Sequence, residues 1–419
     1  MLTRSRSFGA LGADAKRIQP SIHSSGRYVS GRHVGCLLVI GAALTSATPF
    51  SAAIAQSQPF VASGSPNQVA VATALQSLPA RNSLRTALQG QWPTDAAGAR
   101  AGYDRLSGEI HAAVGTQMIE DSHFARDMAF ARLSCAAGCA DGSHLWGQTT
   151  GGWSHQGNDG NAGAITRDMG GVMGGIDTLI FNNSWRVGLL FGYDHSTLTA
   201  DSRSSTASTH DTTYGAYAGT QWGALTLKLG AAYVRHDIST DRLVQVSGLD
   251  AAHVGTDYYG NTAQVFGELG YGMRWGGSTW QPYLQLAQVR QNFESFHESG
   301  SPAALLGRSH EADVTYSTLG VHFVADSFQL GNVSVNARAG IGWRHALGDV
   351  DVNHEFAFRA GGSPYDLRGL VVSRNVGVLD AGLDFTLAPN AVVSLTYTGQ
   401  AGSQRTVDQD LTAAMSVRF

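Results

Sequence analysis

From Gly142 to the C-terminus, apolar and polar residues alternate with a period of two. The alternation is clearest in the last run, whose apolar positions are Leu411, Ala413, Met415, Val417 and Phe419. Successive side chains of a β-strand point to opposite faces, so each such run has one apolar and one polar face. In a soluble sandwich the apolar faces form the core, whereas in a transmembrane barrel they face lipid and the polar faces line the lumen. Both folds fit the alternation.

The connections between the runs favour the barrel, because outer-membrane barrels alternate short turns on one side with long loops on the other. Short turn signals stand at 182–183, 222–223, 276–277, 331–332 and 389–390. Long polar loops are expected at 195–212, 236–260, 294–311 and 346–374. Tilted runs of about ten residues are long enough to cross a bilayer. We therefore expect an all-β transmembrane barrel of about twelve antiparallel strands over residues 141–419.

Composition agrees with this fold. The chain has 52 glycines and only 14% charged residues, and it lacks the series of about 20 consecutive apolar residues that helical membrane proteins need. A net charge of −4, with Lys16 and Lys228 as the lysines, argues against a nucleic-acid partner. Tryptophans near the strand ends are expected to form interfacial girdles. They are Trp146, Trp153, Trp185, Trp222, Trp275, Trp280 and Trp343.

Residues 1–55 have the pattern of a secretory signal, with a basic segment, an apolar run at 34–44 and a small-x-small site at 53–55. We expect the mature chain to begin at Gln56. Polar residues and Pro49 interrupt the apolar run too early for a membrane anchor. The long basic segment is either an extended signal or the result of a start codon placed too far upstream.

A helical segment is expected over residues 67–140. Apolar residues recur there at helical spacing, and Pro79 and Pro93 divide the run. The expected N-caps are Asn82, Thr94 and Ser107, the last of which begins a helix over 107–133. Cys135 and Cys139 form either a small disulfide loop or a chance pair of free thiols, since spacing does not establish disulfide geometry.

Four stretches together resemble the autotransporters of type V secretion, over roughly residues 67–419. They are residues 67–78 with 106–112, the strand Ile341-Gly342-Trp343-Arg344-His345, residues 362–391, and Tyr397-Thr398-Gly399-Gln400 with the terminal Val417-Arg418-Phe419. The resemblance implies a barrel in the outer membrane that carries an upstream passenger to the cell surface. The helical junction would then remain in the pore as a plug.

The resemblance also implies roles for particular residues. Phe419, with Val417 and Met415, would be the signal for barrel assembly. The plug helix would use Arg126, Asp127 and Arg132 to meet lumen residues such as Asp380 and Asp384. The implied partners are outer-membrane lipids, the barrel assembly machinery and periplasmic chaperones, and the barrel is expected to be monomeric. Only residues 56–66 precede the junction, so we expect a passenger that is very short or lost.

No enzyme motif is recognised after Gln56: neither a nucleophile elbow, a zinc-protease helix, a P-loop nor a dinucleotide-binding glycine pattern. The His-Glu pairs at 297–298, 310–311 and 354–355 match no metal-ligand spacing. We expect no catalytic site, cofactor or metal. The alternatives are a plugged or narrow channel or structural protein whose surface loops act in adhesion, and a surface protease or esterase with loop-borne catalytic residues.

Overall fold

The computed structural model describes residues 60–134, 142–403 and 405–419. The chain divides into two units, Met1–Gln56 and Ser57–Phe419, and all the described residues belong to the second. The expected export signal and the pair Cys135 and Cys139 lie outside the described residues. Those interpretations stay predictions.

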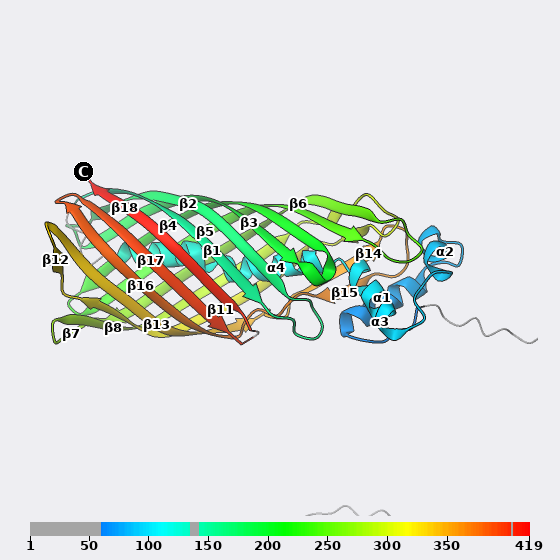
Figure 1. Ribbon diagram of the computed structural model, residues 1–419. Coiled ribbons are helices and arrows are strands. Elements are labelled where there is room, and N and C mark those ends of the chain that lie inside the picture. The colour runs from blue at the N-terminus through cyan, green and yellow to red at the C-terminus, as the bar shows by residue number, and fades with distance from the viewer. Residues whose placement is uncertain (1–59, 135–141, 404) are drawn as a thin grey trace, which may run out of the picture. The chain divides into compact units, whose positions relative to one another are not determined.

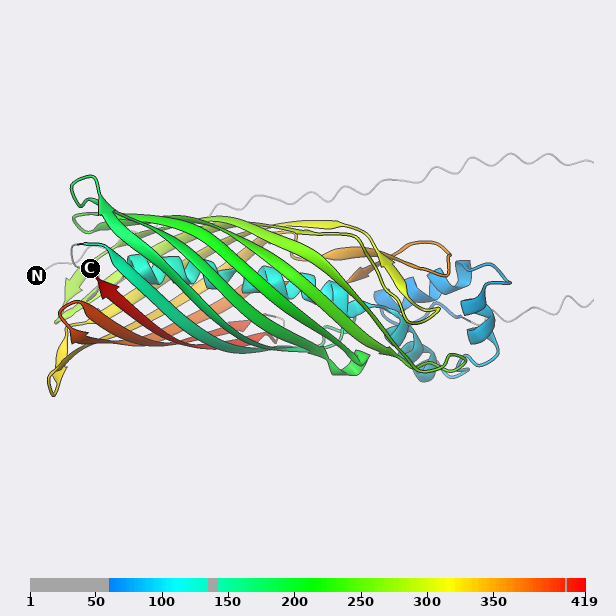
Figure 2. The ribbon, with the colours of Figure 1, turned by 90° about the horizontal axis from the view of Figure 1, so that it is seen from above.

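Within the described ranges, twelve long strands form one closed antiparallel barrel (Figures 1 and 2). Each strand pairs with its neighbours along the chain, and β1 pairs with β18 to close the ring. The strands are β1 (His144–Gln156), β2 (Ile165–Ile180), β3 (Trp185–Ala200), β4 (Ser205–Trp222), β5 (Leu225–Val244), β6 (Ala252–Tyr271), β8 (Ser278–Phe293), β11 (His310–Ala325), β13 (Val333–Gly348), β16 (Asn375–Ala388), β17 (Ala391–Gly402) and β18 (Val407–Arg418). Short strands β7 (Met273–Trp275) and β12 (Phe328–Leu330) extend two hairpins. The expected fold class and strand number are confirmed.

The barrel wall is apolar outside and polar inside. Ile341 and Leu189 are 66% and 62% exposed on the outer face, whereas Lys228 and Arg167 are each 1% exposed and face the lumen. This distribution excludes the sandwich and fits a wall surrounded by lipid. Trp146 is an exception to the predicted girdle: it is 4% exposed and points into the lumen, where its indole N–H donates to Tyr217.

The five short turns lie together at one end of the barrel, called here the turn end, together with the C-terminus (Figure 1). Their residues suit them: Asn182 and Asn183 adopt φ of 55° and 63°, and Gly331 adopts 63°. Asparagine and glycine tolerate this left-handed region best. The opposite end, called the loop end, carries the longer connections. The alternation of turns and loops follows the prediction.

Two of the predicted loops are instead mostly strand. Residues 195–212 belong largely to β3 and β4, which join at the short 3₁₀ turn Asp201–Arg203, and β5 and β6 leave only 245–251 as a connection. The reason is that, along each strand, the apolar residues change from the outward-facing positions to the inward-facing ones. In β5, Leu229 and Tyr233 face outward near the turn end, but further on Asp237 is exposed while Ile238 and Val244 are buried. The outward-facing residues of this part of the strand are polar because the strand extends beyond the membrane.

Five helices precede the barrel within the described residues: α1 (Pro66–Ser77), α2 (Ser83–Gln89), α3 (Ala96–Leu106), α4 (Glu109–Asp121) and α5 (His123–Leu133). Asn82 caps α2 as predicted, but Asp95, not Thr94, caps α3, and Gly108, not Ser107, caps α4. The helix expected over 107–133 is divided at Ser122, whose carbonyl accepts a hydrogen bond from the Gln264 side chain. No helix in the described ranges is sufficiently long and apolar to cross a membrane.

The loop end is covered by folded structure. Strands β9 (Phe296–His297), β10 (Leu305–Gly307), β14 (Asn353–Phe358) and β15 (Tyr365–Arg368) form a small sheet from the two longest connections. Helix α1 packs on β15, where the Asn67 side chain bonds both the N–H and the carbonyl of Arg368. Helices α1 to α3 therefore form a cap at the loop end (Figure 2).

Candidate functional site

Helices α4 and α5 run through the barrel lumen from the loop end towards the turn end (Figures 1 and 2). Every residue from 109 to 119 is buried, although this segment includes polar side chains. The two helices bond to strands around the ring: Arg126 to Gln264 on β6, Arg132 to Asp177 on β2, and Ile119 to Tyr316 on β11. Because their partners lie on several sides of the ring, α4 and α5 are enclosed by the barrel wall. We take α4, α5 and their contacts with the wall as the candidate functional site.

At the loop end, a buried carboxylate joins α4 to the wall and to the loop-end sheet. Glu298 receives two hydrogen bonds from Arg242 of β5, at 2.7 and 2.6 Å, and lies 2.9 Å from Nε2 of His111 on α4. The Glu298 side chain is fully buried. Burial alone would raise its pKa, but the charge and hydrogen bonds of Arg242, followed by those of His111, hold the pKa of Glu298 well below its usual range. Glu298 is therefore ionised and fixes α4.

Midway along the lumen, α5 begins with a buried histidine. His123 contacts Asp127 through Nδ1 at 3.0 Å and Asp408 of β18 through Nε2 at 3.4 Å. Arg167 of β2, which is buried, reaches Asp408 at 3.1 Å and Asp121 of α4 at 3.3 Å. Charged groups of the helices and of the wall thus form one desolvated network.

Near the turn end, Asp177 of β2 holds the end of α5. Its carboxylate accepts hydrogen bonds from Arg132 at 2.7 and 3.1 Å, from Arg186 at 2.5 Å and from Tyr217 at 3.0 Å. Its side chain is fully buried. Trp146 donates to Tyr217 from β1 at 2.8 Å. This cluster, which the sequence did not predict, positions the last turn of the helix.

The plug residues expected from the sequence, Arg126, Asp127 and Arg132, all belong to α5, and the ion pairs seen in the structure differ from the examples expected. Arg132 pairs with Asp177, and Asp384 pairs instead with Arg338 at 3.4 Å. Helix α5 contacts β4 and β5, whereas Asp380 and Asp384 lie on β16, across the ring by strand order. Sequence alternation places a residue on the inner face but does not say which wall the helix contacts.

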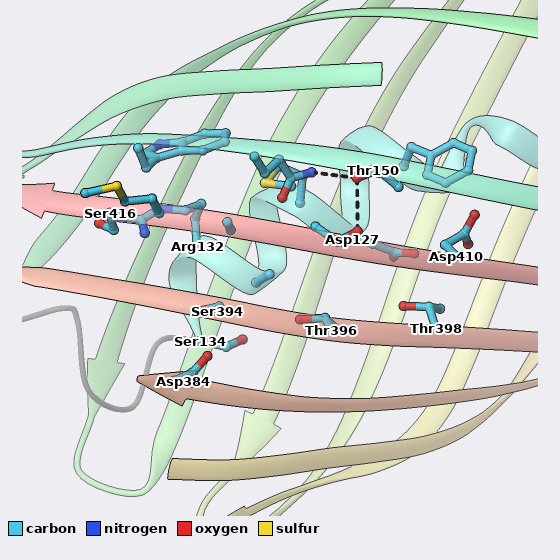
Figure 3. A pocket seen from close by; sticks show the side chains of 18 of the residues that line it. Asp127, Arg132, Ser134, Thr150, Asp384, Ser394, Thr396, Thr398, Asp410 and Ser416 are labelled. Carbon is cyan, nitrogen blue, oxygen red and sulfur yellow. Dashed lines mark hydrogen bonds between the residues drawn. The ribbon is translucent and has the colours of Figure 1, made fainter. Parts of the chain in front are cut away.

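Space remains on the side of α5 that faces away from β4 and β5. A cavity of about 160 Å³ lies between α5 and the wall (Figure 3). Its lining mixes apolar and polar side chains, and the hydroxyl-bearing residues that line it from the strands are Thr150, Ser394, Thr396, Thr398, Thr412 and Ser416. A second cavity of about 150 Å³, lined in part by Arg126, Asp127 and Asp380, continues beside it. Helix α5 therefore occupies most of the lumen around it and leaves these two cavities unfilled.

The proposed assembly residues occupy the outer face of the last strand. Phe419 is 72% exposed and Met415 50% exposed, and Val417 lies between them with the same orientation. The Phe419 N–H donates to the carbonyl of Ser143, next to the start of β1. These residues are therefore at the seam where the first and last strands meet.

Comparison with known proteins gives consistent matches. Residues 145–398 match the family described as the autotransporter beta-domain. An extracellular serine protease from Serratia marcescens is 32% identical over 325 residues, which cover 75% of this chain and 30% of that protein. A second extracellular serine protease from the same organism matches over 324 residues at the same identity and coverage. The chain thus spans less than a third of the length of these relatives.

Two solved structures are also similar in fold. The translocator domain of the autotransporter NalP from Neisseria meningitidis has a TM-score of 0.58 and 18% identity, and the match covers 74% of this chain and 99% of that one. The beta domain of the Bordetella autotransporter BrkA has a TM-score of 0.50 and 17% identity, and the match covers 67% and 100% of the two chains.

Proposed function

Since this chain belongs to the autotransporter family, with an outer-membrane translocator barrel as its β-domain, we propose that the barrel carries the segment N-terminal to α1 through its lumen to the cell surface. The observation that supports this most is the path of the chain. Helices α1 to α3 lie at the loop end, α4 and α5 pass through the lumen, and β1 begins at the turn end. A chain left in this position has its N-terminal side outside the cell if the loops face outward.

We further propose that α4 and α5 plug the pore once transfer is complete. Arg126 and Arg132 bind the wall through Gln264 and Asp177, and Asp127 orients His123. A helix that made no contacts with the wall would leave the polar lumen open to water. These contacts and the loop-end cap restrict the path through the lumen. The two cavities beside α5 are the residual space.

Assembly of the barrel is proposed to depend on its last strand. Phe419, Val417 and Met415 present an apolar edge at the seam with β1. In this proposal the barrel assembly machinery reads that edge, periplasmic chaperones hold the chain before insertion, and the folded barrel sits as a monomer among outer-membrane lipids. We assign the barrel a role in transport rather than catalysis, and the protease activity in the names of the Serratia proteins is a statement about those proteins.

Cysteine labelling of the two barrel ends tests the proposed export. In a background with Cys36, Cys135 and Cys139 replaced by serine, Gln91→Cys places a thiol on the exposed cap, and Asn332→Cys places one in an exposed turn. A membrane-impermeant maleimide should label Gln91→Cys in intact cells, and Asn332→Cys only after the outer membrane is permeabilised. Labelling of the turn but not of the cap in intact cells would overturn the proposal.

A further inference from the structure

Three potential metal ligands lie together where α5, called here the pore helix, meets the last strand, β18. His123 comes from α5, and Asp408 and Asp410 come from the inner face of β18. One ligand atom from each lies within 4.8 Å of the others, and all three residues are buried. Residues two apart on a strand face the same side, so β18 presents both carboxylates to the helix.

Asp410 is the unusual member of this group. It is 4% exposed, and among the described residues neither of its carboxylate oxygens has a hydrogen-bond partner. It lines the cavity beside α5 (Figure 3). A buried carboxylate without a partner costs several kcal/mol, so such groups in proteins are usually paired or coordinate a metal.

The neighbouring strand β1 leaves space for this carboxylate. Gly152 of β1 is directly across from Asp410 in the strand pairing. A Cβ at residue 152 would stand 2.2 Å from Oδ1 of Asp410. Any other residue at position 152 would displace that oxygen. The orientation of Asp410 into the cluster is therefore built into two strands.

Arg167, the buried cation beside this cluster, makes no ion pair with Asp410. Arg167 divides its charge between Asp408 and Asp121. Among the described residues, no Lys, Arg or His nitrogen lies within ion-pair distance of Asp410. The carboxylate of Asp410 is thus available to pair with an additional positive charge.

The imidazole is oriented as a metal-binding histidine would be. Asp127 contacts Nδ1 of His123 at 3.0 Å, which leaves Nε2 directed towards Asp408 and the Gln400 amide. In zinc proteins a carboxylate on one ring nitrogen commonly fixes the tautomer that coordinates through the other. Mixed imidazole and carboxylate ligands suit Zn²⁺, with three protein ligands and an open fourth position, better than Mg²⁺ or Ca²⁺, which prefer oxygen alone.

We propose that His123, Asp408 and Asp410 bind one divalent transition-metal ion of the Zn²⁺ type inside the lumen. Nε2 of His123 and one oxygen of each aspartate coordinate the ion, and a water molecule from the adjoining cavity occupies the fourth position. The ion links α5 to β18 and so adds a bond between the pore helix and the wall. Binding of the ion does not depend on the proposed export, but its effect on the helix rests on the proposed plug.

The test uses the full barrel, without a histidine tag, refolded in detergent and stripped with a chelator. Zn²⁺ binding is measured by calorimetry, and Co²⁺ is used as a spectroscopic probe whose visible absorption reports coordination. The wild type should bind one Zn²⁺ and melt at a higher temperature with the metal. Asp410→Asn should weaken binding at least tenfold and remove the thermal shift. His253→Gln changes an exposed histidine paired with Asp241 and should bind as the wild type does.

The proposal is wrong if the stripped wild type takes up no Zn²⁺, or if Asp410→Asn binds it as tightly as the wild type. Gly152→Ala provides a second variant should Asp410→Asn fail to fold, because it keeps all three ligands but displaces Oδ1 of Asp410. It too should bind more weakly. Equal affinity in a folded Gly152→Ala barrel would contradict the assigned geometry. Cysteine labelling remains independent of all these outcomes, so failure of the export proposal is recognised separately.

Discussion

Asp177→Asn should release the end of the pore helix. The Asp177 side chain is fully buried and shares its charge between Arg132 on α5 and Arg186 on β3. Removing one partner from a buried ion pair costs about 3–5 kcal/mol. Only Arg132 belongs to the helix, and its side chain is 11% exposed, so we assign about 2 kcal/mol of that cost to helix docking. At 1.4 kcal/mol per factor of ten, the ratio of undocked to docked helix rises roughly 30-fold.

Conductance of the purified barrel in planar bilayers measures this ratio as the fraction of time spent in a large open state. Asp326→Asn is the matched control, because its partner Arg274 is 71% exposed and surface pairs contribute about 1 kcal/mol or less. Asp177→Asn should open far more often than Asp326→Asn. Equal opening of the two folded variants would refute the assignment. A large, permanently open conductance in the wild type would refute the plug itself.

Two further predictions concern the loop-end sheet and the assembly edge. Burial, reinforced by His310 and His111, lowers the pKa of His354 from 6.5 to about 3. Because the unfolded chain takes up this proton first, stability falls as pH drops from 6.5 towards 3, by roughly 2 kcal/mol between pH 7.5 and 5. His354→Leu should remove that part of the pH dependence in denaturant unfolding, and an unchanged dependence would count against it. Phe419→Ala should lower the amount of heat-modifiable, folded barrel in the outer membrane several-fold, whereas a similar loss for Leu330→Ala, an exposed apolar residue at the same end, would show that the last strand has no special role.

Local chemistry made much of the fold predictable. The turns at 182–183 and 331–332 contain asparagine and glycine, which accept the left-handed backbone conformation found there. The alternation in β18 likewise identified the outward positions of Met415 and Phe419, both of which are exposed. These features depend on a few neighbouring residues and on one solvent boundary, so a single sequence is enough to predict them.

Features that depend on distant partners were not predictable. Outside the membrane the alternation of β5 reverses, so the exposed Asp237 suggested a loop where a strand continues. Trp146 was expected at the interface, but it is drawn into the lumen by Tyr217 and by Arg132, whose guanidinium lies 5.5 Å from its ring centre. The ion pair of Arg132 with Asp177 was not predictable either, because the strands that α5 contacts are set by packing around the whole ring. A role for His123 was not predictable, because Asp408 and Asp410, which lie beside it in the structure, are far along the chain.

Export of the segment N-terminal to α1 is the role we propose for this barrel. The most direct measurement is to insert an epitope tag after Gln58 and probe intact cells with antibody, while heat-modifiable migration verifies that the barrel is folded. We expect a tag that is accessible on intact cells and is removed by added protease. A tag that stays protected on a folded barrel until the outer membrane is broken would contradict it.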